Sequence, residues 1–432
     1  MSRIANLAST NALVSRLMQT QSKVNDLQIQ ATTEKVSQTY QGIARDSQRL
    51  VNIENSRNML SNFVATNEAA DLRLKTMESV VTGIRKTIID FRESLFEFET
   101  STAGEEQRTK DIQDAAFRAL TDMNVYLNTD VDGRFMFAGG RVTTQPVDLG
   151  LSTIGAFQAR YDGESTVYPP TRDAHVETNV ALTATDTGGL DFDFATGTIT
   201  ANNAGSLAGI PEGSLITISN SGSNDGTYTV VSNDNDTITI AGNLTIPPST
   251  IAVTGSVVDE LDAPATISVS SYYKGDTVSQ TQRVDQSREF TLDLNAIDPT
   301  FEKAIRAMGL IAQGAYGTSG GLENHPERFD QAIYLITSSL EITAAGTPPF
   351  GPESRNNISQ VQQNMGYQRI LIDQTNKQHE TLIGFFDQNV IETENVNTTE
   401  IVARLLDETR ALELAYQAIA RIQQLSLGKF LG

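Results

Sequence analysis

The chain has no cysteine and no tryptophan among its 432 residues. Without cysteine it can form no disulfide, no thiolate metal site and no cysteine nucleophile. Histidine is almost as scarce, and His175, His325 and His379 lie too far apart to form a ligand motif such as H-E-x-x-H. The sequence therefore predicts no bound metal and no cofactor.

Basic residues are also few, because 32 Lys and Arg stand against 53 Asp and Glu, for a formal net charge of −21. Such a surface repels phosphate backbones, so no nucleic-acid partner is expected. Between Arg172 and Lys274 there is no Lys or Arg, whereas Asp173, Glu177, Asp186 and further acids lie in that stretch. The stretch is predicted to be a solvated module that faces outward.

Long apolar runs are missing as well. No run of about 18 apolar residues occurs, so no membrane insertion is expected. The first residues, MSRIANLAST, contain neither the apolar core nor the small-residue cleavage site of a secretory signal. Export, if it occurs, is expected to use a dedicated route that recognises another feature.

The motifs of common active sites do not occur either. There is no glycine-rich phosphate loop and no G-x-S-x-G turn. Residues 128–133 resemble a calcium loop, but Gly139 stands where the bidentate glutamate belongs, and residues 233–236 are typical of a β-turn. The acidic pair Asp191 and Asp193 is interpreted as a solvated strand edge. No catalytic residue and no metal ligand is predicted, and the chain is not expected to be an enzyme.

Helical periodicity dominates the first hundred residues. Leu13, Leu17, Val24, Leu27 and Ala31 follow 3-4 spacing on one face of a first helix.

A second helix carries a heptad seam sustained from residue 53 to 98. One seam position holds Ile53, Leu60, Leu74, Val81, Ile88 and Leu95, and the other holds Phe63, Ala70, Met77, Ile84, Phe91 and Phe98. Only Ser56 and Asn67 are polar in this register. The seam predicts a rod roughly 65–70 Å long that packs against other helices. A break at 101–104 and a third helix to Leu127 follow.

The middle of the chain has the composition of β structure. Residues 132–140 indicate a turn and a short strand, and residues from there to about 295 are rich in Thr, Ser, Gly, Asn and Val. Alternating apolar residues at 216–218, 228–230 and 238–240 predict strands, with a hairpin turn at Asp225-Gly226. Two further strands are expected at 267–273 and 290–294.

Helices are predicted to resume at Pro299 and Pro326, because proline is common at the first position of a helix. A long helix from about Ile358 follows, on whose seam His379 is expected to be partly buried and hydrogen-bonded. A last helix carries an apolar stripe at Ile401, Leu405, Leu412, Ile419 and Ile422.

The predicted fold class is therefore α+β and multidomain. An elongated helical, coiled-coil rod is made from both termini, with a β-rich middle region and an inserted small β domain. The expected domains are terminal assembly helices (1–42 with 397–432), a helical rod domain (43–140 with 298–396), a β domain (141–174 with 266–297) and an inserted β domain (175–265).

The stripes at the two ends have few other helices to cover them. Two lone amphipathic helices are only marginally stable in water, so these stripes are predicted to order fully between subunits. A self-contained hairpin within one chain is the alternative. The predicted subunit-assembly residues are Leu13, Leu17, Val24, Leu27, Leu405, Leu412, Ile419, Ile422 and Leu425.

Several segments together resemble the flagellin superfamily, most closely its family of hook–filament junction proteins, hook-associated protein 3. They are the rod at 52–98, the turn GRFMFAG at 133–139, YYKGD at 272–276, DPTFE at 298–302 and the ending AYQAIARIQQLSL at 415–427. The S-G-x-R-[IV]-N motif that is common after the first helix in this superfamily is not present here. The insert at 175–265 lies outside the resemblance.

The resemblance implies a structural adaptor of the bacterial flagellum that joins the hook to the flagellin filament. It implies an extracellular location and export by the flagellar type III apparatus. The implied partners are further copies of the chain, hook-associated protein 1, flagellin and a cytoplasmic export chaperone. The alternative in the same structural class is flagellin itself. A remote alternative is a secreted enzyme with a catalytic β region, and an adhesin-like role for the insert also stays open.

Overall fold

A computed structural model describes residues 2–431 except 45, 177–181, 184–189, 194, 202–203, 206, 209, 220–223, 242–265 and 342–352. Side chains of residues 2–10, 182–183, 266, 268–270 and 422–431 are not described either. The chain divides into two compact units, one made of residues 1–68 and 373–432 and the other of residues 69–372. The predicted division into four domains remains a prediction.

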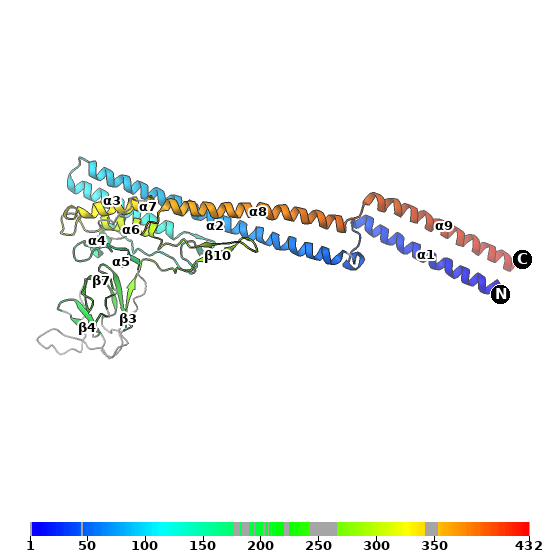
Figure 1. The fold of residues 1–432 in the computed structure, drawn as a ribbon, viewed down its shortest axis with the longest axis horizontal. Coiled ribbons are helices and arrows are strands. Elements are labelled where there is room, and N and C mark those ends of the chain that lie inside the picture. Colours follow the sequence, from blue (N-terminus) through cyan, green and yellow to red (C-terminus); the bar gives the residue numbers. More distant parts are fainter. Residues whose placement is uncertain are drawn as a thin grey trace. The chain divides into compact units, whose positions relative to one another are not determined.

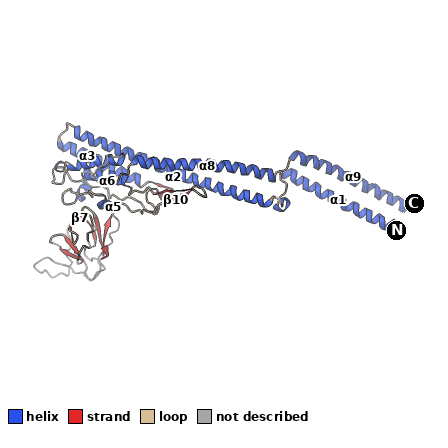
Figure 2. Ribbon diagram, viewed as in Figure 1, coloured by secondary structure: helices blue, strands red, loops and turns tan. Residues whose placement is uncertain are grey.

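Helices form both ends of the described chain and strands occur in its middle (Figure 2). The α-helices are α1 (Ser2–Thr33), α2 (Ser47–Thr100), α3 (Glu105–Leu127), α4 (Ile154–Arg160), α5 (Arg172–Val176), α6 (Pro299–Ala312), α7 (Glu327–Leu340), α8 (Ile358–Glu394) and α9 (Thr398–Leu431). Short 3-10 helices lie at Tyr40–Ile43 and Leu322–Asn324. The predicted α+β class, with long helices from both ends and a β-rich middle, is confirmed.

In the first unit, α1 and α9 lie side by side (Figure 1). The link after α1 pairs with the link before α9, because Val36 N donates to Glu394 O at 2.7 Å and Val396 N donates to Glu34 O at 2.9 Å. These two backbone bonds, with the Lys35–Glu394 ion pair at 2.9 Å, hold the start of α9 beside the end of α1.

The same unit contains the first part of α2 and the last part of α8. Asn67 donates a hydrogen bond to Asn376 at 2.8 Å, and Arg57 forms an ion pair with Asp387 at 3.2 Å. His379 is buried and its ring lies 5.8 Å from that of Phe63, measured between centroids. His379 was predicted to be partly buried on the helical seam, and at 3% exposed it is buried more deeply than predicted.

The heptad seam of α2 is confirmed along its whole predicted length. Every residue that the spacing assigned to it is buried or half-buried, including the polar Ser56 and Asn67. The helix has 54 residues, which corresponds to roughly 80 Å at 1.5 Å per residue. It ends at Thr100, where residues 101–104 were predicted to break it.

The main hydrophobic core of the second unit lies between α2, α3, α6 and α7. The central helix is α6, in which every residue from Thr300 to Ala312 is buried. Its start follows the predicted pattern, since Pro299 opens the helix and the Asp298 carboxylate accepts from Thr300 N at 2.9 Å. An aromatic layer extends this core, with Phe137 edge-on to Phe301 at 5.9 Å between ring centroids.

Two small hairpins flank this core. Strands β1 (Asp130–Val131) and β2 (Arg134–Phe135) pair around Asp132 and Gly133, both of which have positive φ. The Asp130 carboxylate accepts from Gly133 N at 3.1 Å, which is the geometry of a turn. Strands β10 (Gln280–Arg283) and β11 (Glu289–Leu292) form the second hairpin.

An inserted seven-stranded antiparallel sheet has the order β3-β9-β6-β7-β8-β5-β4. Its strands are β3 (Leu182–Thr183), β4 (Leu190–Asp193), β5 (Thr198–Ala201), β6 (Leu215–Ser219), β7 (Gly226–Asn233), β8 (Thr237–Ala241) and β9 (Thr266–Ser270). It encloses its own core, in which Phe192, Ile199 and Ile238 are fully buried. The strands predicted at 216–218, 228–230 and 238–240 and the turn at 233–236 are confirmed.

Candidate functional site: the terminal helices and a buried polar network

The predicted assembly residues lie on the facing sides of α1 and α9. Val24 is 6% exposed, and Leu13, Leu17, Leu27, Leu405, Leu412 and Ile419 are half-buried within the single chain. The side chains of Ile422 and Leu425 lie outside the described residues. Within one chain the two inner faces therefore cover each other in part, and their predicted role between subunits remains a prediction.

A second apolar stripe runs along the outer faces of the same helices, and the sequence-based prediction missed it. On α1 it includes Val14 and Met18, the latter 64% exposed. On α9 it includes Leu406 at 56% and Leu414 at 65% exposed. Large apolar side chains at this exposure, gathered on two adjacent helices, are typical of a contact surface rather than of isolated surface residues.

The neighbours of Val14 and Met18 in α1 are uncharged. Val14 and Met18 line a shallow groove together with Asn11, Ser15, Gln19 and Ser22. One ion pair, Lys23 with Glu408 at 3.6 Å, links α1 to α9 among the described residues. A surface of apolar and uncharged polar side chains can be buried against another protein without leaving an unpaired charge.

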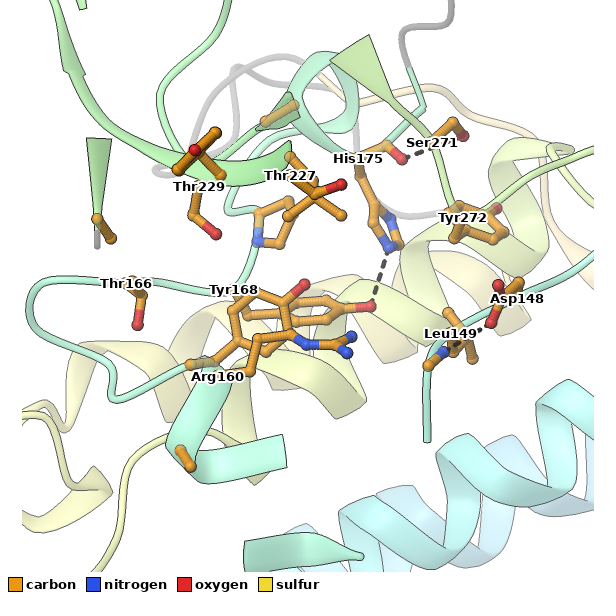
Figure 3. Close-up of a pocket in the computed structure, with 18 of the residues that line it drawn as sticks. Asp148, Leu149, Arg160, Thr166, Tyr168, His175, Thr227, Thr229, Ser271 and Tyr272 are labelled. Carbon is orange, nitrogen blue, oxygen red and sulfur yellow. Dashed lines mark hydrogen bonds between the residues drawn. The ribbon is translucent and has the colours of Figure 1, made fainter. Parts of the chain in front are cut away.

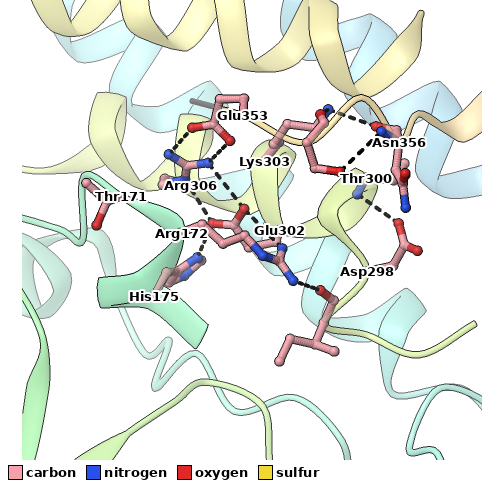
Figure 4. A network of polar contacts seen from close by, with 12 residues as sticks. Thr171, Arg172, His175, Asp298, Thr300, Glu302, Lys303, Arg306, Glu353 and Asn356 are labelled. Atoms are coloured by element: carbon pink, nitrogen blue, oxygen red, sulfur yellow. Dashed lines mark hydrogen bonds and ion pairs between the residues drawn. The ribbon is translucent and has the colours of Figure 1, made fainter. Parts of the chain in front are cut away.

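A separate polar cluster lies in the core of the second unit, on α6 (Figure 4). Glu302 is fully buried and accepts from Arg306 Nε at 2.8 Å. Arg306 also holds Glu353 in two hydrogen bonds of 2.7 and 2.8 Å, and Arg172 lies 3.6 Å from Glu302. Two carboxylates and two guanidinium groups thus balance each other inside the protein.

His175 completes this cluster from the element that precedes the inserted sheet. Its Nδ1 lies 3.0 Å from Glu302 Oε1 and its Nε2 lies 2.9 Å from the Tyr168 hydroxyl. Because an ionised carboxylate can only accept, we assign the proton to Nδ1, and the neutral ring then accepts from Tyr168 at Nε2. Tyr272, where the chain returns from the sheet, stacks on this ring at 4.5 Å between centroids.

The pKa values follow from burial and from these partners. Burial disfavours the charged form of Glu302, but the hydrogen bond from His175 and the charge of Arg306 outweigh it and lower its pKa to about 2. Burial lowers the pKa of His175, although its hydrogen bond with Glu302 acts in the opposite direction. The ring is therefore neutral at pH 7, in agreement with the assigned proton.

Lys303, the neighbour of Glu302 on α6, has a different set of partners. Its ammonium donates to the carbonyl oxygens of Ser338 at 2.7 Å, Ser354 at 3.0 Å and Asn356 at 2.8 Å. Burial lowers the pKa of Lys303 to about 8. This side chain joins the end of α7 to the segment that leads into α8.

A histidine hydrogen-bonded to a glutamate is also a common arrangement for a general base. Here His175 is 4% exposed, Glu302 is fully buried, and both nitrogens of the ring already have partners. The arrangement is therefore suited to fixing the base of the inserted sheet to α6. Within the described part of the chain, no group of three or more His, Asp or Glu residues is arranged to hold a metal ion.

None of the described helices combines the length and the hydropathy that a membrane span requires.

Comparison with known proteins gives structural likenesses at low sequence identity. A putative flagellar hook-associated protein from Vibrio parahaemolyticus is 8% identical, with 81% of this chain and 97% of that chain covered and a TM-score of 0.39. The flagellar hook-associated protein 3 from Legionella pneumophila is 15% identical, with 79% and 97% covered and a TM-score of 0.32. The flagellar protein FlgL from Xanthomonas campestris is 13% identical, with 82% and 99% covered and a TM-score of 0.25.

No protein-family model and no curated protein matches the chain.

Proposed function

We propose that the chain is a structural adaptor of the bacterial flagellum that joins the hook to the flagellin filament. The observation that carries the proposal is the outer apolar stripe of α1 and α9, which remains exposed after the two helices have paired within the chain. The segments that resemble hook–filament junction proteins, from the rod at 52–98 to the ending at 415–427, support the flagellar assignment.

The proposed mechanism is assembly through the terminal helices. In the isolated chain, α1 and α9 have one apolar face against each other and one face in water. Burying a side chain such as Leu406 or Leu414 against a neighbouring subunit stabilises the contact by roughly 1.5–3 kcal/mol. Several such residues on each subunit are enough to drive ordered association. The inner residues of α1 and α9, such as Leu13 and Ile419, then become fully enclosed.

The proposed location, export route and partners follow from the resemblance to hook–filament junction proteins. The chain is proposed to act outside the cell, after export by the flagellar type III apparatus. Its proposed neighbours are hook-associated protein 1, flagellin and further copies of itself, and an export chaperone is proposed to bind it before export. The proposal requires no catalytic step.

The outer stripe can be tested by charge substitution in a strain that lacks the native protein. We expect Met18→Glu and Leu414→Glu to reduce incorporation into flagella by at least about tenfold, because each would leave a carboxylate unpaired in the contact. Met18→Leu, which keeps an apolar side chain of similar size, should incorporate normally. Val278→Glu, at a site 61% exposed but outside the terminal helices, is the matched control and should incorporate normally.

Normal incorporation of both glutamate variants would refute the role of the outer stripe. Long filaments formed by the purified wild-type chain alone would instead favour the flagellin alternative.

A further inference from the structure

A cavity of about 610 Å³ lies between the inserted sheet and the helical core of the second unit (Figure 3). Residues of the core form one side of it, among them Arg160, Tyr161 and Tyr168. Strand β7 forms the opposite side with Thr227 and Thr229. The predicted β insert thus contributes to a concave site that neither the sequence nor the proposed assembly role explains.

The core side of the cavity is built from rigid aromatic rings. Tyr161 and Tyr168 pack edge-on with centroids 5.0 Å apart, and His175 stacks on Tyr272 at 4.5 Å. The Tyr168 hydroxyl is held by His175, and the Tyr272 hydroxyl donates to Ala296 O at 2.9 Å. Since these hydroxyls have protein partners and Tyr168 and Tyr272 are only 4% and 8% exposed, the two rings form an apolar floor and leave only their edges to a ligand.

The sheet side supplies hydroxyl groups instead. Thr227 and Thr229 are alternate residues of β7 and therefore point to the same side of the strand. Within the described residues, neither threonine hydroxyl has a hydrogen-bond partner. Two hydroxyls about 7 Å apart along a strand can each donate to and accept from a polyhydroxylated ligand.

Three exposed charged side chains line this cavity, the cations Arg160 and Lys274 and the anion Asp148. Arg160 and Lys274 both line it and are exposed, and among the described residues neither forms an ion pair. The carboxylate of Asp148 accepts from Gly150 N at 3.0 Å within its own turn, and the two cations leave the cavity with a net positive charge. In a chain with a net charge of −21, an arginine and a lysine without acidic partners favour a carboxylate on the ligand.

We propose that this cavity binds a short acidic saccharide, a chain of sugar rings carrying a carboxylate. The ligand lies on the apolar floor that the aromatic edges form, the threonine hydroxyls of β7 bind the sugar hydroxyls, and Arg160 and Lys274 bind the carboxylate. The volume suits a ligand of about two sugar rings. The proposal does not depend on the assembly role, because every residue that it uses lies between positions 148 and 274.

The test is binding of digalacturonate and of its neutral counterpart, galactobiose, to the purified full-length chain, measured by titration calorimetry and saturation-transfer NMR. We expect digalacturonate to bind at least about tenfold more tightly than galactobiose. Arg160→Gln with Lys274→Gln should remove this preference, and Thr227→Val with Thr229→Val should weaken the binding of both sugars. The matched control, Lys86→Gln with Lys110→Gln, changes two exposed lysines elsewhere and should bind as the wild type does.

Circular dichroism establishes that each variant is folded before its binding is compared. Equal affinity for the two sugars, binding of digalacturonate that survives the loss of both cations, or no binding of either sugar by the folded wild type would each overturn the proposal.

Discussion

Glu302 is the centre of the buried polar cluster at α6. It faces Arg306, Arg172 and His175, and it has no exposed surface. A buried carboxylate of this kind is stabilising only as long as all of its partners are in place.

The partners of Glu302 lead to a pH-dependent prediction for Glu302→Gln. The pKa of Glu302 is lowered from 4.5 to about 2, so its contribution is complete above pH 4.5 and is lost as the pH falls toward 2. At pH 7 we expect the variant to be less stable than the wild type by roughly 3 kcal/mol, the free energy that corresponds to this shift. Urea unfolding at pH 7, 4 and 3 should show the difference shrinking as the pH falls.

Glu106→Gln is the control for this series, because Glu106 is exposed and its partner Lys110 is its neighbour on the same helix. It should unfold as the wild type does at each pH. A difference between Glu302→Gln and the wild type that stayed constant from pH 7 to pH 3 would contradict the assignment of an ionised Glu302.

These charges could not have been placed from the sequence. Glu302, Lys303 and Arg306 have the spacing of charged residues on an exposed helix face, yet all three are buried. Their partners, such as His175 and Glu353, lie far from them in the sequence. No local sequence pattern therefore indicates that these residues are close in space. The one available signal was the unusual absence of apolar residues at these positions in an otherwise apolar helix.

At the scale of helices and strands, two helical glycines make a matched pair. A methyl group added at Gly309 of α6 would lie 2.2 Å from a ring carbon of Tyr168, whereas one at Gly366 of α8 would meet nothing within 4 Å. Alanine normally stabilises a helix relative to glycine by roughly 1 kcal/mol. At Gly309 the clash with a buried ring should outweigh this gain.

We therefore expect opposite signs for the two substitutions. Gly309→Ala should destabilise the chain by about 1–3 kcal/mol through overpacking, and Gly366→Ala should stabilise it by about 0.5–1 kcal/mol. Chemical denaturation of both variants measures the difference. If both glycine variants were stabilised, the close packing of Tyr168 on α6 would be wrong.

Elements with strong local signals were predicted well. The seam of α2, the start of α6 at Asp298-Pro299 and the alternating strands β6, β7 and β8 all follow from residue spacing. The short helices α4 and α5 and strand β10 were missed, because they span only 7, 5 and 4 residues. Elements of that length are set by their contacts with the core, here through Phe157 and His175, and have too few residues to show a period.

For the whole molecule, the sequence predicted an assembly surface on the terminal helices from one of their two apolar stripes, and the role of that stripe between subunits stays a prediction. The heptad pattern identifies the stripe with the best spacing, which includes Leu17 and Leu405, and these residues lie between α1 and α9 within the chain. Met18 and Leu406 follow a second stripe on each helix. Only the pairing of the two helices shows which stripe remains in water.

The proposed function of this chain is to join the hook to the filament. The most direct measurement is immunogold labelling of the native protein along intact flagella of the source bacterium. We predict label confined to the junction between hook and filament, at a few copies per flagellum. Label along the whole filament, or flagella that carry no label, would contradict it.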